Sequence, residues 1–135
     1  KHMTASALLS HADTILPVVI EAISSDDIEA CITSLTACSI VVKENLELIE
    51  KYVDIIIPRI IVLTKEAINK NPKYRILAIE ILLEMLRLPY LRIHKFKSKV
   101  LIALGDSIDD GARSVRRKSV QVRNEWFVTN GENEF

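Results

Sequence analysis

Apolar residues recur at helical spacing along most of the chain, and helix-starting and helix-breaking residues divide them into six stretches. The predicted helices cover residues 14–23, 28–42, 53–69, 73–88, 95–108 and 112–128. Asn71 followed by Pro72 is a typical helix start, because the asparagine side chain accepts from free N–H groups and proline suits the first helical position. Residues 24–26 (Ser-Ser-Asp) and 109–111 (Asp-Asp-Gly) are expected to cap two further helices. The pattern predicts an all-α protein.

The same pattern returns at an interval of about forty residues. Pro17 is followed forty-one residues later by Pro58, and Arg75 is followed by Arg116 after the same interval. Two helices per repeat at this spacing are typical of HEAT-type arrays, in which each hairpin packs on its neighbours. The sequence therefore predicts an α-solenoid of about three HEAT-type helical hairpins in a right-handed superhelical array.

The middle and the end of this array have different polar surfaces. The helix predicted at 73–88 is apolar around most of its circumference, so it needs neighbours on two sides, and Leu82 is predicted to lie in the core. Its thin polar edge consists of Arg75, Glu80, Glu84 and Arg87. The last helix combines basic residues with Val115, Val120 and Val122, which predicts one packed face and one wet face, as in a C-terminal capping repeat.

The chain is predicted to contain three segments. Residues 1–3 (Lys-His-Met) have the look of a remnant left by an expression vector. Residues 4–128 form the array, interpreted as the C-terminal fragment of a longer solenoid because its first apolar residues have no charged cover. Residues 129–135 are expected to be a flexible polar tail.

Composition supports a folded helical domain without cross-links. Hydrophobic residues make up 49% and charged residues 27%, and three glycines and four prolines are too few for a fold of many short strands. Cys31 and Cys38 are seven residues apart on one predicted helix, too far to form a disulfide, and are expected to be core residues. The longest apolar runs are too short to cross a membrane.

Few residues of this chain have the type and spacing that a catalytic or metal site requires. His11 and His94 have no patterned ligands around them, and the three glycines are too scattered to cradle a phosphate. Asp106, Asp109 and Asp110 lack the alternating ligands of a calcium loop, so helix capping explains them better. We expect no enzyme activity, no metal site, no cofactor and no small-molecule substrate.

The balanced net charge hides a basic segment. Residues 87–123 contain ten basic and three acidic residues. Such a segment predicts contact with an acidic protein surface or with a nucleic-acid backbone. Aromatic residues suitable for stacking on bases are few, which disfavours direct nucleic-acid binding.

The last forty residues resemble the C-terminal end of the large HEAT-repeat adaptor of the cytosolic iron-sulfur protein assembly (CIA) targeting complex, a family linked to nucleotide excision repair and transcription. The resemblance rests on residues 101–104 (Leu-Ile-Ala-Leu), 109–110, Arg113, 115–116, Val120 and the closing Arg-x-Glu-Trp-Phe run at 123–127. Residues 4–50 resemble this family only in helical periodicity.

What this resemblance implies is a non-catalytic adaptor that works in the cytoplasm and nucleus. Its C-terminal repeats would dock the small scaffold subunit of the complex, which in turn holds a β-propeller subunit, while other surfaces collect apo iron-sulfur client proteins of DNA replication and repair. Two alternatives stay open: an unrelated HEAT scaffold of the transport or phosphatase type, and a nucleic-acid-binding module that uses residues 87–123.

Docking is predicted to involve the terminal unit. Basic side chains would form a charged rim and aromatic side chains would serve as apolar anchors if they are exposed, with core packing as the alternative for Trp126. The predicted partner-binding residues are Tyr90, Arg113, Arg116, Arg117, Lys118, Arg123, Trp126 and Phe127.

Overall fold

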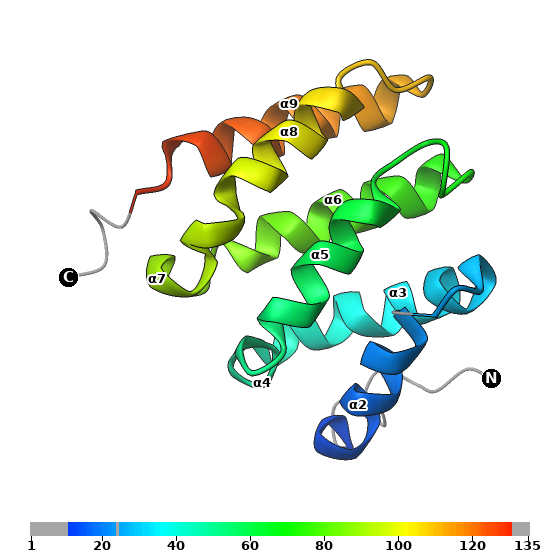
Figure 1. Cartoon of the computed structure of the whole chain (residues 1–135), viewed down its shortest axis with the longest axis vertical. Helices are drawn as coiled ribbons and strands as arrows, with labels where there is room; N and C mark the ends of the chain where they lie inside the picture. The colour runs from blue at the N-terminus through cyan, green and yellow to red at the C-terminus, as the bar shows by residue number, and fades with distance from the viewer. Residues whose placement is uncertain (1–10, 24, 131–135) are drawn as a thin grey trace.

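The computed structural model describes residues 11–23 and 25–130, and in it three helical hairpins stack one on another (Figure 1). The hairpins consist of α2 (Ala12–Ile23) and α3 (Ile28–Glu44), α5 (Val53–Leu63) and α6 (Pro72–Met85), and α8 (Lys97–Ser107) and α9 (Arg113–Val128). The connections carry α4 (Leu46–Glu50), α7 (Tyr90–Ile93) and the 3-10 turn η1 (His94–Phe96). The predicted all-α helical repeat is confirmed, and no strand occurs within the described ranges.

The hairpins contribute one helix each to two layers (Figure 1). In one layer α3 packs on α6 and α6 packs on α9, while α2, α5 and α8 form the other layer and contact one another less. The handedness of the superhelix stays a prediction. The predicted vector remnant at 1–3, the tail beyond residue 130 and the candidate cap Ser24 lie outside the described residues.

The structure corrects the end of one predicted helix and the N-cap of another. The helix predicted at 53–69 ends at Leu63, because the buried Asn69 turns back and donates from Nδ2 to the Leu63 carbonyl at 2.9 Å. The N-cap of α3 is Asp27, whose carboxylate accepts from the Glu29 N–H at 3.0 Å, and not a residue of 24–26. The short helices α4 and α7 were not predicted, since one turn of helix leaves no periodic signal.

Other predicted starts and core positions are confirmed. Asn71 caps α6 by accepting from the Lys73 N–H at 3.0 Å, with proline at the next position. Leu82 is fully buried, as are both cysteine side chains. Val120, expected to pack beside Val115 and Val122, is instead 44% exposed.

Burial should make the cysteines chemically inert. Removal from water raises the pKa of the Cys38 thiol to about 12, so almost no thiolate forms at pH 8. We expect Cys38 to react with a thiol reagent at least roughly 100-fold more slowly in the native chain than in guanidinium chloride. Single variants Cys31→Ser and Cys38→Ser assign the rates to each thiol. Native labelling as fast as denatured labelling would contradict this placement.

The largest departure from the sequence-based expectation is Arg75, which is not part of a polar edge. It is only 2% exposed, and its Nε and Nη2 donate to Asp110 Oδ2 and Oδ1, both at 2.7 Å. Its Nη1 donates to the Asn69 carbonyl at 2.9 Å. This two-bond ion pair links the second hairpin to the turn of the third.

Asp110 is not the cap of α9 that the sequence predicted, because the N-cap is Ala112 and no side chain caps it, and Asp110 is the partner of Arg75 instead. Its Oδ1 also accepts from the Ala112 N–H at 2.8 Å. Burial acts to raise the pKa of this carboxyl, but the hydrogen bonds from Arg75 and Ala112 and the charges of Arg75 and Arg116 lower it below its ordinary 3.8. The aspartate is thus held ionised inside the array.

Candidate partner-binding surface

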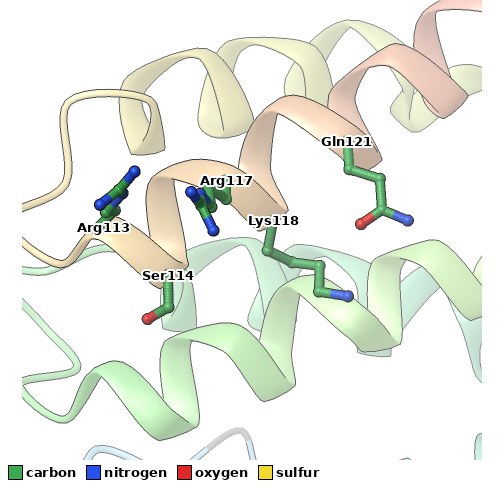
Figure 2. Close-up of a pocket in the computed structure, with 5 residues that line it drawn as sticks. All are labelled: Arg113, Ser114, Arg117, Lys118 and Gln121. Carbon is green, nitrogen blue, oxygen red and sulfur yellow. The ribbon is translucent and has the colours of Figure 1, made fainter.

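A shallow hollow of about 460 Å³ lies on α9 and is bordered by basic side chains. We call it the basic hollow, and it is lined by Arg113, Ser114, Arg117, Lys118 and Gln121. Helical spacing brings these residues together, because positions 114, 117, 118 and 121 follow one flank of the helix. Figure 2 shows the side chains of Ser114 and Lys118 pointing from α9 toward α6.

The two arginines of the basic hollow are available for a partner. Arg113 and Arg117 are exposed, and neither side chain forms a hydrogen bond or ion pair with any residue between 11 and 130 that the structure describes. Lys118 forms an ion pair with Glu80 of α6, with 3.5 Å between Nζ and Oε2. This pair is partly exposed and weak, so the lysine still contributes positive potential.

The basic hollow continues into an apolar depression between α9 and α6. This second hollow has a volume of about 500 Å³ and shares Ser114 with the first. Ile76 and Leu77 of α6 are half-buried there, and Lys73 stands at its edge. A partner that follows both hollows would meet positive charge at one end and aliphatic side chains at the other.

Two of the predicted rim arginines have structural roles instead. Arg116 donates from Nη1 to the Asp110 carbonyl at 2.8 Å, and Arg123 donates from Nε to the Leu101 carbonyl at 3.0 Å. Both side chains are half-buried. Arg116 links α9 to the turn that precedes α9, and Arg123 links α9 to α8. They lie on a different flank of α9 from the basic hollow.

The three aromatic residues predicted as anchors are placed differently from one another. Trp126 is fully buried and donates from Nε1 to the Leu82 carbonyl at 2.9 Å, so it is a core residue and not a surface anchor. Tyr90 is half-buried and stacks on His94 with 5.6 Å between ring centroids. Phe127 is 63% exposed. Of the three, Phe127 alone presents most of its side chain to water.

Between residues 11 and 130 the structure groups no three histidine, cysteine or acidic side chains in a way that would hold a metal ion. Among the same residues, each helix is too short or too polar to cross a membrane.

Comparison with known protein families shows to which family this chain is related. The model of the RNAPII transcription regulator C-terminal family (MMS19_C) matches residues 1–86, which is more than half of the chain. The chain belongs to this family.

Curated relatives extend the similarity of this MMS19_C member through the third hairpin. The MMS19 nucleotide excision repair protein homolog of Dictyostelium discoideum is 27% identical over 132 residues, which cover 95% of this chain. The DNA repair/transcription protein mms19 of Schizosaccharomyces pombe is 28% identical over 116 residues, or 85% of the chain, and the homolog of Homo sapiens is 27% identical over 121 residues, or 90%. The chain spans only 11% to 12% of the length of these relatives.

Sequence reasoning about this MMS19_C chain located the basic helix but missed the apolar half of the surface. Ile76 and Leu77 belong to a helix that the sequence predicts to be apolar on nearly all sides. The spacing of apolar residues does not show that these two side chains are only half-buried next to α9. Lys73, in the first turn of α6, was not singled out. Subtracting 41 from the residue numbers of the basic residues of α9 gives positions on α6. This repeat interval is the sequence signal that could have identified α6 as the neighbouring surface.

Proposed function

We propose that this chain is a non-catalytic docking module of an adaptor in the cytosolic iron-sulfur assembly targeting complex. The observation that carries the proposal is the basic hollow of α9, with its two unpaired arginines beside an apolar depression. Membership of the MMS19_C family supports it, as do relatives named for nucleotide excision repair and for DNA repair and transcription. Its place of work would be the cytoplasm and nucleus.

The proposed partner at this surface is the small scaffold subunit, approached through an acidic surface that carries one or more aliphatic side chains. Carboxylates would meet Arg113 and Arg117, and an aliphatic group would cover Ile76 and Leu77. The scaffold subunit would hold the β-propeller subunit, and apo client proteins would bind elsewhere on the full adaptor. Bringing cluster donor and client onto one array raises their effective concentration without any bond-making group on the array itself.

Reversing the two unpaired arginines should weaken this interaction. We expect the double variant Arg113→Glu/Arg117→Glu to bind the purified scaffold subunit at least about tenfold more weakly, because rim charges steer association and their reversal adds repulsion. The midpoint of thermal unfolding should change by no more than about 2 °C, since neither side chain has a partner to lose. Isothermal titration calorimetry and circular dichroism provide the two measurements.

A matched control has the same change of charge outside the third hairpin. Lys43→Glu/Lys51→Glu reverses two exposed lysines outside the basic hollow and should leave the affinity within about twofold of the parent. Equal weakening by both double variants would show a general charge effect and would remove the basic hollow from the interface. Binding of duplex DNA with a steep loss between low and high salt, in place of protein binding, would favour the nucleic-acid alternative.

A further inference from the structure

One flank of each inner helix receives the following hairpin, and on α9 no hairpin covers this flank within residues 11–23 and 25–130, which the structure describes. At an interval of 41 residues the equivalent positions are Ser34, Cys38 and Val41 on α3, Arg75, Ile79 and Leu82 on α6, and Arg116, Val120 and Arg123 on α9. The first six side chains are all buried, at 7% exposure or less. On α9, at the end of the stack in Figure 1, Val120 is 44% exposed.

We call the uncovered flank the end stripe, and it consists of Arg116, Val120, Arg123 and Phe127. Phe127 corresponds to the half-buried Leu86 of the second hairpin and is 63% exposed. A helix flank that only faces water is expected to be polar. The end stripe has kept large apolar side chains at two of its four positions.

Arg116 repeats half of the bonding of Arg75. The Nη1 of each arginine donates to the carbonyl of the equivalent residue in its own hairpin, Asn69 at 2.9 Å and Asp110 at 2.8 Å respectively. The Nε and Nη2 of Arg75 then hold the Asp110 carboxylate of the next hairpin. The Nε and Nη2 of Arg116 form no hydrogen bond or ion pair within the part of the chain that the structure describes.

We propose that the end stripe is a second docking surface, which binds a helical segment of a partner protein that carries a carboxylate. The carboxylate occupies on Arg116 the place that Asp110 occupies on Arg75, and the helix packs on Val120 and Phe127 of α9 as α9 packs on α6. The partner thus continues the stack as a further unit. This surface is separate from the basic hollow, and the identity of its partner, but not the docking surface itself, rests on the proposed function.

The charge of the end stripe argues against a second copy of this chain as the occupant. Face-to-face association would place Arg116 and Arg123 opposite the same two arginines. The Asp110 of such a copy is already held by its own Arg75. An acidic partner satisfies the unused side of Arg116 without this repulsion.

A lengthened chain tests whether the end stripe accepts such a unit. Residues 1–130 followed directly by residues 90–135 keep the 41-residue interval and place a second copy of Asp110 where it meets Arg116. We expect one cooperative thermal transition, at a higher temperature than in the parent. Asn in place of the appended aspartate should lower the midpoint by at least about 5 °C, because it breaks a buried pair.

A double-mutant cycle separates this pair from other effects. In an Arg116→Gln background the same appended Asp-to-Asn change should lower the midpoint by less than half as much. Equal decreases in both backgrounds, or a separate low-temperature transition for the appended unit, would overturn the proposal. Concentration-dependent self-association of the parent in sedimentation would also overturn it, in favour of a second copy.

The partner itself is tested with the purified scaffold subunit of the proposed complex. Val120→Glu/Phe127→Glu should reduce its affinity at least tenfold, while Val18→Glu/Ile102→Glu, which changes exposed apolar residues of α2 and α8, should not. If the parent binds and the end-stripe variant binds equally well, the end stripe does not dock this protein and the inference fails. If the parent does not bind at all, the proposed function fails and the lengthened chain alone decides the inference.

Discussion

Replacing Asp110 by alanine is expected to destabilise the chain by about 3 to 5 kcal/mol, because it leaves the buried Arg75 guanidinium with only the exposed Glu66 carboxylate, 3.9 Å away, as an acidic neighbour. The two bonds at 2.7 Å join hairpins two and three, so the loss should fall on the stacking of the third hairpin. Urea unfolding followed by circular dichroism measures the change in free energy.

The matched variants distinguish an unpaired charge from a lost contact. Arg75→Met/Asp110→Leu removes both charges and should recover most of the lost stability, since a buried ion pair can often be replaced by apolar groups. Asp109→Ala changes the exposed neighbouring aspartate and should cost less than about 0.5 kcal/mol. If Asp110→Ala were as mild as Asp109→Ala, the ion pair would contribute nothing to the stacking.

The same aspartate gives the stability a defined dependence on pH. Its pKa is lowered in the folded chain, so the ionised form is favoured by folding and its contribution is fully present above its ordinary value of 3.8. This contribution is lost as the pH falls through the lowered value. Between pH 5 and about pH 2 the parent should therefore lose more stability than Asp110→Asn, which has no carboxyl to protonate there.

Replacing Trp126 by alanine is expected to destabilise the chain by about 3 to 5 kcal/mol, the range for large aromatic residues in a core. The indole fills the space between α9 and α6, and its Nε1 donates to the Leu82 carbonyl. Trp126 is the only tryptophan of the chain. In the parent, its fluorescence should therefore shift to longer wavelength in the same urea range in which the helical signal is lost.

Phenylalanine at position 126 provides the control for the hydrogen bond. Trp126→Phe keeps an aromatic ring but leaves the Leu82 carbonyl without this donor, and it should cost about 1 to 3 kcal/mol. Phe127→Ala changes the exposed neighbour and should leave the free energy of unfolding within about 0.5 kcal/mol of the parent. If Phe127→Ala lowered the free energy of unfolding more than Trp126→Ala, the assignment of Trp126 to the core and of Phe127 to the surface would be wrong.

The two proposed docking surfaces would give the third hairpin two ways to hold partners. The basic hollow attracts through exposed charge and is expected to be sensitive to salt. The end stripe combines apolar side chains with two half-buried arginines and is expected to resist salt more strongly. Measurement of affinity at two ionic strengths for the two pairs of variants separates these contributions.

The aromatic and basic residues of α9 show how much of the structure the sequence pattern can predict. Its sequence marks a basic helix near the end of the chain, and that placement is confirmed. The assignment of each side chain to a rim, a core or a bond to the backbone depends on which flank of α9 faces α6 and which faces α8. Arg116 and Arg117 are neighbours in the chain, yet one fastens a turn and the other faces water.

The sequence by itself determined the class of fold and its period. Helical spacing of apolar residues, the cap at Asn71 and the 41-residue interval are local signals, because they depend on contacts within a helix or between copies of one pattern. Only the tertiary structure decided that Arg75 is buried, that Asp110 is its partner thirty-five residues away, and that Trp126 belongs to the core. These outcomes arise when one hairpin excludes water from another, and the chain encodes that packing through many weak contacts rather than through any motif.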